Sequence, residues 1–234
     1  YKAIKEALNK KCFMKNYSQI GQDYIASSLL KEKKNGTFVD LGCAGPIWIN
    51  NTYLLEKEFN WKGISIDINS GIPNLWNQER PNSTLIITDA TLINFSKMFE
   101  ENNLPKRIDY LSLDLDPPEA TFESLKKIPL DEYSFNVITF EHDAYRMGID
   151  FRESTREYIS SFGYQLVFNL YDQDDVYINQ SMKIPSIKDR GLIIKNIKTQ
   201  PQPYDPWDWK RDEKGSVPDD IKIQSSRPVR KKIY

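Results

Sequence analysis

Three acidic residues each close a short, strand-like apolar run in the first half of the chain. Asp40 follows TFV, Asp67 closes GISID, and Asp89 follows LIIT. If these runs are parallel strands, their carboxyl ends meet at one edge of a sheet, where α/β proteins bind ligands. The three carboxylates would then line one site and accept hydrogen bonds from hydroxyl, amino or ammonium groups of a ligand.

A loop of small residues, GCAGP, follows the first of these runs, and its spacing separates two classes of ligand. Small residues let the backbone approach a ligand closely. Dinucleotide binders use G-x-G-x-x-G with the pyrophosphate on a helix N-terminus, whereas Gly42 and Gly45 give only G-x-x-G. Asp40 would repel a pyrophosphate but suits the cationic amino-acid end of S-adenosylmethionine (SAM). The pattern favours SAM over NAD, the alternative being a plain tight turn.

The acids that close the second and third runs add support for a nucleoside. Asp67 can accept hydrogen bonds from both hydroxyls of a ribose, and Asp89 with Ala90 can meet an adenine amino group and leave space for the ring. Each acid alone is also compatible with a solvated strand end or a turn. The predicted cofactor-binding residues are Asp40, Gly42, Cys43, Gly45, Asp67, Ile68, Asp89, Ala90 and Asp114.

Strand-like runs alternate with helical segments along most of the chain. The runs are 37–41, 63–68, 84–88, 108–114, 136–141, 164–170 and 176–178, and the helical segments are 22–33, 52–59, 119–127 and 152–162. Several runs are apolar on both faces, as buried parallel strands are. The alternation predicts a doubly wound, Rossmann-like α/β sheet. The last two runs are too close for a crossover helix, so they should form an antiparallel hairpin. A mostly parallel seven-stranded sheet ending in such a hairpin is the class I methyltransferase fold.

The chain divides by composition into a domain and a tail. Residues 1–198, with N-terminal helices within 1–35, should form the methyltransferase-like domain. Residues 199–234 are rich in proline and charge and lack periodicity, so they should form an extended tail. Trp207 and Trp209 are candidates to anchor that tail to the domain or to stack on a sugar.

Composition narrows the partners and the compartment. Lys and Arg total 32 and Asp and Glu 33 in 234 residues, without the basic excess typical of nucleic-acid binding. Two cysteines make no disulfide framework, and no apolar run approaches the roughly 20 residues that cross a bilayer. We therefore expect a cytoplasmic protein that binds neither nucleic acid nor membrane. The sequence gives no indication of its oligomeric state.

Short motifs over residues 17–179 resemble those of the FkbM-type methyltransferases. YSQIGQD resembles a pattern ahead of the family's first helix, FVDLG and NTYLLE its loop and following helix, and WKGISID its second strand. Further on, IDYLSLDLDPPEA and VITFEHD resemble its fourth and fifth strands. The resemblance implies a SAM-dependent O-methyltransferase of sugars or other hydroxyl-bearing metabolites.

The chain departs from the family pattern at two places. Gly45 and Pro46 stand where the family has an acid and a glycine in the loop, and Asp116-Pro117 stands in place of Glu-Gly. Proline fixes φ and lacks an N–H, which the first residue of a helix tolerates, so Pro46 could begin the next helix. These departures motivate the alternative of a catalytically inactive methyltransferase-like module that binds a partner or a glycan.

Methyl transfer to a hydroxyl needs a positioned acceptor and a group that takes its proton. The candidates follow the fourth and fifth runs, and the predicted catalytic residues are His142, Asp116 and Glu141. His142, the only histidine, titrates nearest neutral pH, although pairing with a neighbouring carboxylate is the alternative. Asp114, Asp116, Glu141, His142 and Asp143 could also hold Mg²⁺ or Mn²⁺, so a divalent metal stays open beside SAM. The expected acceptor is a small molecule or glycan.

Overall fold

The protein is described by a computed structural model that covers residues 16–197, apart from the side chains of residues 73 and 74. The predicted tail, with Trp207 and Trp209, and the first 15 residues lie outside the described residues. The predicted domain boundary at residue 198 and any helix within residues 1–15 also lie outside the described residues.

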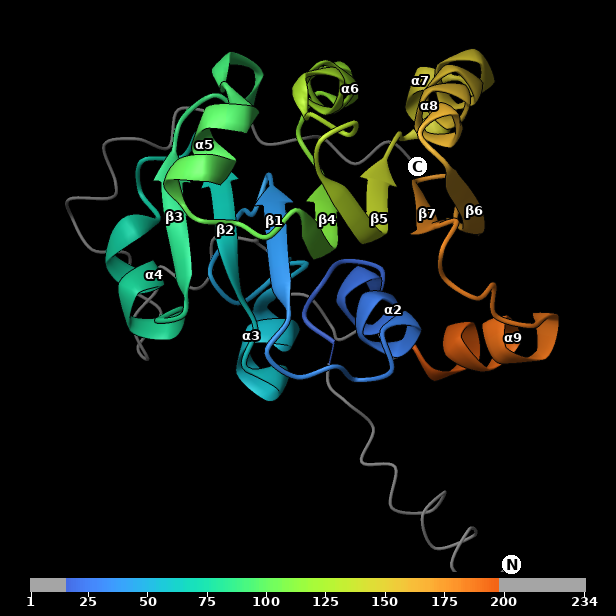
Figure 1. The fold of residues 1–234 in the computed structure, drawn as a ribbon, viewed down its shortest axis with the longest axis horizontal. Helices are drawn as coiled ribbons and strands as arrows, with labels where there is room; N and C mark the ends of the chain where they lie inside the picture. Colours follow the sequence, from blue (N-terminus) through green and yellow to red (C-terminus); the bar gives the residue numbers. More distant parts are fainter. Residues whose placement is uncertain (1–15, 198–234) are drawn as a thin grey trace, which may run out of the picture.

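One sheet of seven strands organises the described residues, in the order β3-β2-β1-β4-β5-β7-β6. The strands are β1 (Thr37–Leu41), β2 (Lys62–Asp67), β3 (Ser83–Ile87), β4 (Arg107–Leu113), β5 (Ser134–Glu141), β6 (Tyr164–Leu170) and β7 (Asp174–Asn179). The strands from β3 to β5 all pair in parallel, so their carboxyl ends lie along the upper edge of the sheet in Figure 1. The strand order reverses between β1 and β4, where such sheets bind ligands.

The sheet ends in the antiparallel hairpin that the sequence predicts. β7 pairs antiparallel with both β5 and β6, and the turn between β6 and β7 places Tyr171 and Asp172 at positive φ. The doubly wound, mostly parallel, Rossmann-like α/β fold is therefore confirmed. Asp174 at the start of β7 lies opposite Glu141 at the end of β5, which brings the hairpin into the same edge.

Helices cover both faces of the sheet (Figure 1). They are α2 (Gln22–Leu29), α3 (Tyr53–Phe59), α4 (Pro73–Glu79), α5 (Phe95–Glu101), α6 (Pro118–Lys127), α7 (Ala144–Met147), α8 (Ile149–Ser161) and α9 (Ile187–Asn196), with a 3-10 turn η1 (Ala90–Leu92). The core has a large apolar cluster on each face. One joins the sheet to α5, α6 and α8, and the other joins it to α2 and α3.

Both faces of β1 are covered by helices, so neither face is exposed to solvent. All five of its residues are buried. Val39 and Leu41 pack in the cluster with α5 and α6, while Phe38 packs in the cluster with α2 and α3. Because side chains alternate along a strand, Asp40 lies on the same face as Phe38, beneath α3. This placement matters for the site.

Some predicted helix limits are wrong. The helix expected over 22–33 ends at Leu29, because Lys31 and Glu32 adopt the left-handed conformation at φ 55°. Pro46 does not begin a helix. Six residues without helix or strand, 47–52, separate it from the start of α3 at Tyr53. The helices α4, α5 and α9 were not predicted.

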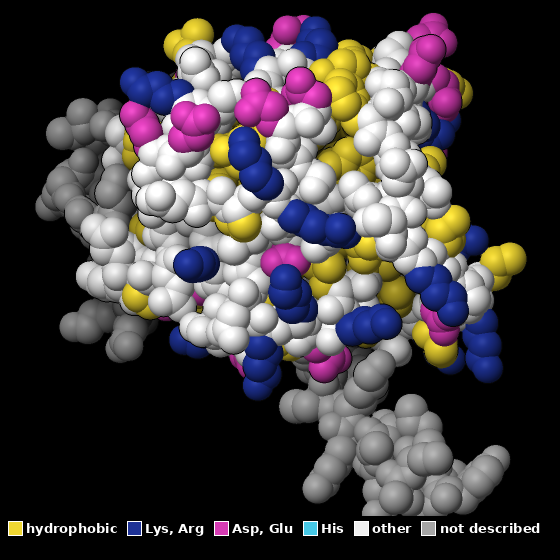
Figure 2. All heavy atoms as spheres, viewed as in Figure 1, with side chains coloured by type: hydrophobic (Ala, Val, Ile, Leu, Met, Phe, Trp, Pro, Cys, Tyr) yellow, Lys and Arg dark blue, Asp and Glu magenta, His cyan; other side chains and the backbone are white. Residues whose placement is uncertain are grey.

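Charged side chains of both signs are mixed on the face shown in Figure 2, without a continuous basic stripe. Between residues 16 and 197, none of the helices has the length and apolar character required to cross a bilayer.

Candidate cofactor site

The carboxyl edge of β1, β2, β3 and β4 carries most of the residues predicted to bind a cofactor. Asp67 is the last residue of β2, and Asp114 directly follows β4. Asp89 lies two residues beyond β3 and caps η1. The parallel register of these strands brings them to one edge, as expected.

Gly42 fixes the start of the loop after β1 against the end of β4. Its φ is +82°, and an added Cβ would lie 1.9 Å from the carbonyl oxygen of Asp114. The Gly42 N–H donates to the carbonyl of Ile66 at 2.9 Å, and the Asp114 N–H donates to that of Leu41 at 3.0 Å. The loop therefore leaves the sheet at the point where the strand order reverses, and only glycine fits there.

Asp67 ties the loop to the end of β2. One carboxylate oxygen accepts from the N–H of Ala44 at 2.9 Å, and the other accepts from the N–H of Asn69 at 2.8 Å. These two bonds fix the direction of the Asp67 carboxylate at the edge where the loop meets β2. The neighbouring Ile68 has 67% of its surface exposed, and a flat apolar ring could pack against it.

The two residues expected beside an adenine lie next to each other at the start of η1. Asp89 accepts from the N–H of Thr91 at 2.8 Å and from its hydroxyl at 2.6 Å, and these bonds lower the pKa of Asp89. This is the turn-forming role that the sequence left open as an alternative. Ala90 is 4% exposed and contributes to the core instead of offering a free surface.

Cys43 and Gly45 face inward. The thiol of Cys43 packs against Ile72 and Trp76, and burial raises the pKa of Cys43 well above its usual range. The side-chain amide of Asn50 donates to the carbonyls of Cys43 and Gly45, both at 2.9 Å. The N–H of Cys43 also donates to the carbonyl of Ile66 at 3.2 Å, so its thiol is buried and both of its backbone polar groups have partners within the protein.

Asp40 lies beneath the loop and is 0% exposed. Its Oδ2 accepts from the hydroxyl of Thr52 at 2.9 Å, while its buried Oδ1 has no hydrogen-bond partner among the described residues. Burial raises the pKa of Asp40 to about 6. A negative charge held here acts on a ligand above the loop through the low-dielectric interior, not by direct contact.

Asp40→Asn should make the protein more stable at pH 7, by about 2–3 kcal/mol. Because the pKa of Asp40 is raised on folding, the folded state holds more protons between about pH 4 and 6, and stability falls as pH rises through that window. The amide removes this loss, so the advantage should shrink below about pH 4. Urea unfolding across pH checks this, with exposed Asp131→Asn as control, expected to change stability by less than about 0.5 kcal/mol. A destabilised Asp40→Asn at pH 7 would contradict the assignment.

Carboxyl groups accumulate where β4, β5 and β7 meet. Asp114 and Glu141 share a hydrogen bond, and burial raises the pKa of both side chains. The negative charge of Asp114 raises the pKa of Glu141 further. Asp174 accepts from the side-chain amide of Gln22 at 3.1 Å, and burial also raises its pKa well above the usual range. Because the pKa of Glu141 rises to about 11, Glu141 holds a proton at neutral pH and shares it with Asp114.

His142 points away from these acids. It is 0% exposed; its Nδ1 accepts from the N–H of Ala144 at 3.1 Å, and its Nε2 lies 3.5 Å from the buried carboxylate of Asp175. Glu141, the last residue of β5, lies opposite Asp174, whereas His142, directly after the strand, lies beside Asp175, the next residue of β7. The geometry matches the pairing alternative, and His142 does not reach an acceptor in this conformation.

Asp116, the remaining catalytic candidate, is exposed at the start of the turn before α6 and precedes a cis peptide bond to Pro117. Arg146 of α7 pairs with Asp116 at 3.2 Å and with Asp143 at 3.0 Å. Within residues 16–197, no three His, Cys, Asp or Glu side chains are grouped so as to hold a metal ion. Among the described residues, the acids are therefore not grouped into the divalent-metal site that the sequence left open.

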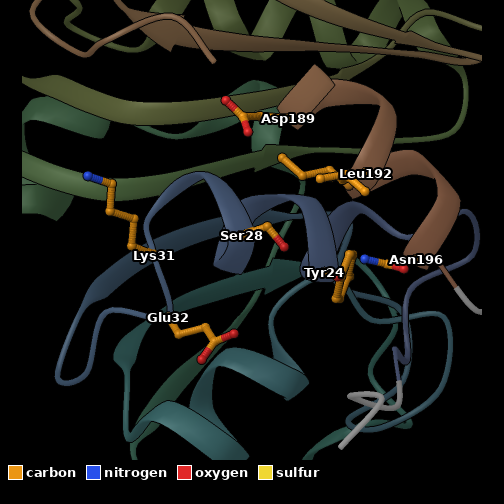
Figure 3. A pocket seen from close by; sticks show the side chains of 8 residues that line it. Tyr24, Ser28, Lys31, Glu32, Asp189, Leu192 and Asn196 are labelled. Carbon is orange, nitrogen blue, oxygen red and sulfur yellow. The ribbon is translucent and has the colours of Figure 1, made fainter. Parts of the chain in front are cut away.

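A groove lies elsewhere on the molecule, away from the predicted cofactor site. This groove of about 430 Å³ separates α2 from α9, and Figure 3 shows Tyr24 and Ser28 on one side and Leu192 and Asn196 on the other. None of the predicted site residues lines it.

Sequence reasoning missed the residues that hold the loop over 43–52. Asn50 and Arg80 make most of the contacts, and Asn51 donates to Ser112 and Asp114 at 3.0 Å each. A signal for Asn50 and Asn51 was present, because adjacent asparagines before a helix favour capping. Nothing local marks Arg80, whose contacts cross about 30 positions of sequence.

Comparison with known proteins finds similar folds among solved structures. A candidate rRNA methylase from Clostridium thermocellum is 16% identical, covers 72% of this chain and 99% of its own, and has a TM-score of 0.49. Human methyltransferase-like protein 13, in complex with S-adenosylhomocysteine (SAH), is 12% identical over 78% of this chain and 92% of its own, with a TM-score of 0.48. Fibrillarin from Aeropyrum pernix, with bound SAM, is 14% identical over 67% and 75%, with a TM-score of 0.43.

These are similarities of fold alone. The sequence matches no protein-family model and no curated protein, so the FkbM-type resemblance stays a prediction.

Proposed function

We propose that the chain is a SAM-dependent methyltransferase that binds its cofactor at the carboxyl ends of β1, β2 and β3. The observation that carries the proposal is the position of Asp67, a carboxylate at the end of β2 whose two oxygens accept from the backbone N–H groups of Ala44 and Asn69. A carboxylate held at this place on the ligand-binding edge is of the type that accepts hydrogen bonds from two vicinal ribose hydroxyls. Exposed Ile68 beside it offers an apolar surface to the adenine ring.

The residues around the loop fit the rest of the cofactor. Gly42 keeps the loop backbone close to β4, leaving no Cβ in the way. Asp40 beneath the loop supplies negative charge for the ammonium and sulfonium of SAM, and its orphaned, buried Oδ1 is consistent with a group selected for charge more than for packing. NAD, with a pyrophosphate instead, would be repelled here.

For the reaction we propose O-methylation of a sugar, glycan or small metabolite. Bound SAM supplies the methyl group, and the chain must orient the acceptor hydroxyl and remove its proton. The Asp114–Glu141 pair, which holds one proton between two carboxyls, can take a second. Asp116, just beyond β4, and its ion-pair partner Arg146 of α7 would contact the acceptor.

Calorimetric titration with SAH tests the cofactor assignment. Wild-type protein should bind SAH, and Asp67→Ala should weaken binding by at least about 100-fold, because two charge-assisted hydrogen bonds to the ribose are lost. Glu123→Ala, an exposed carboxyl on α6, is the matched control and should bind like wild type. No detectable heat from wild type at millimolar SAH would refute the proposal.

One observation favours the inactive module as a second candidate. The single histidine is buried with both ring nitrogens occupied, so it cannot take the proton of an acceptor hydroxyl in this conformation. If SAH binds as above but a panel of hydroxylated acceptors yields no methylated product by mass spectrometry, the binding module becomes the better description.

A further inference from the structure

We infer that Arg80 is a positioning residue for the cofactor loop, acting through Asn50 and Thr52 without touching the ligand. The inference rests on the proposed function, since it assumes that the loop after β1 binds SAM. Arg80 follows α4, outside every segment predicted to bind the cofactor. Through its partners it nevertheless affects both the loop after β1 and the buried Asp40 beneath that loop.

Arg80 is one of the largest fully buried side chains, with 1% of its surface exposed. Its Nη1 donates to the carbonyl of Pro46 at 3.2 Å and to Oδ1 of Asn50 at 3.0 Å, and its Nη2 donates to the hydroxyl of Thr52 at 2.8 Å. Residues 46–52 form no helix or strand. Their backbone therefore depends on such side-chain bonds for a fixed geometry.

Two partners of Arg80, Asn50 and Thr52, are each hydrogen-bonded to a residue proposed to serve the cofactor. Asn50, held by Arg80, donates to the carbonyls of Cys43 and Gly45. Thr52, also held by Arg80, donates to Oδ2 of Asp40 at 2.9 Å. One guanidinium thus sets both the backbone of the loop and the orientation of the acid beneath it.

The surroundings of Arg80 require a guanidinium. Glu56 of α3 neutralises it at 2.6 Å, and the rings of Trp76, Phe38 and Tyr53 surround its central carbon at 4.5, 5.7 and 5.8 Å. Lysine could keep the ion pair with Glu56, but its single nitrogen cannot reproduce a planar fork that serves four acceptors while stacking on aromatic rings. Arg80→Lys should therefore loosen the loop while retaining the charge.

The test compares Arg80→Lys with Arg156→Lys in the full chain. Arg156 makes a bidentate ion pair with Asp175 on another part of the sheet. Arg156→Lys therefore removes a guanidinium group of the same kind at a distance from the loop and serves as the matched control. Hydrogen exchange without ligand should speed up about 10-fold or more in residues 43–52 of Arg80→Lys only. The Kd for SAH, measured well below the unfolding temperature, should rise about 10-fold or more in Arg80→Lys and stay unchanged in Arg156→Lys.

The outcomes separate this inference from the proposed function. Global destabilisation would not change the Kd of a protein that is almost wholly folded, so a purely structural Arg80 would leave SAH binding unaltered and overturn the inference. Unchanged exchange in residues 43–52 would overturn it too, whether or not SAH binds. If exchange rises as expected but wild-type protein binds no SAH, the loop depends on Arg80 and only the proposed function fails.

Discussion

Gly42→Ala is expected to lower the free energy of unfolding by about 3–5 kcal/mol and to abolish SAH binding. Two costs add at this position. An alanine at φ +82° is strained by about 1–3 kcal/mol, and its Cβ would lie 1.9 Å from the carbonyl oxygen of Asp114, so the loop or β4 must move at a further cost of about 1–3 kcal/mol. Urea unfolding measures the first effect and calorimetry the second.

Gly163→Ala provides the matched control for this prediction. Its φ is +80°, but the nearest atoms to an added Cβ belong to the flexible end of the Gln180 side chain, at 2.9 Å. It should therefore lose about 1–2 kcal/mol from backbone strain and bind SAH normally. Equal losses of stability in the two variants would show that the contact with β4 is unimportant and contradict the account of the loop.

Asp175→Asn is expected to destabilise the protein by about 3 kcal/mol at pH 7. The carboxylate is 0% exposed, accepts from Arg156 at 2.6 and 2.9 Å and from Asn169 at 3.0 Å, and lies near His142. Removing one partner of a buried ion pair leaves the other charge uncompensated, here moderated because Arg156 is partly exposed. Thermal and urea unfolding measure the loss.

The pH dependence has a definite sign. The hydrogen bonds from Arg156 hold the pKa of Asp175 below its usual range in spite of burial, so the carboxylate stabilises the fold above about pH 4 and this contribution is lost as pH falls. The difference between wild type and Asp175→Asn should narrow at low pH. Asp172→Asn, which breaks an exposed pair with Arg152, should cost less than about 1 kcal/mol. A similar cost for both variants would contradict the burial argument.

The strands could be predicted because a strand that is buried on both faces has a nearly continuous run of apolar residues. The run TFVDL predicts β1 at its observed limits, and the short spacing between the last two runs correctly required an antiparallel pair. The helices that were not predicted have a weaker pattern of apolar residues. The short α5 buries three of its seven residues, whereas the equally short α3, which was predicted, buries five. α4 begins at a proline, α7 has only four residues, and α9 buries none of its residues.

Two of the missed helices still carried a start signal. Asn94 caps α5 by accepting from the N–H of Lys97, and Ser186 and Asp189 form a capping box at α9. Such caps can be recognised from sequence. The position of Pro46 could not be, because its loop is fixed by Arg80 from beyond α4.

In the candidate site, the positions of the residues along the sheet could be predicted, but the directions of their side chains could not. The strand-end acids were predictable because a parallel sheet brings its carboxyl ends together, and Asp67 and Asp114 lie at that edge. The directions of the side chains were not predictable. Asp40 and Cys43 turn inward, and His142 turns toward Asp175, which follows it by more than thirty residues.

The central claim is that the carboxyl edge of β1, β2 and β3 holds the nucleoside of SAM, and a crystal structure of the protein saturated with SAH tests it most directly. The account predicts both ribose hydroxyls within hydrogen-bonding distance of the Asp67 carboxylate and the adenine ring against Ile68. SAH bound with its ribose away from Asp67, or at another part of the molecule such as the groove between α2 and α9, would contradict it.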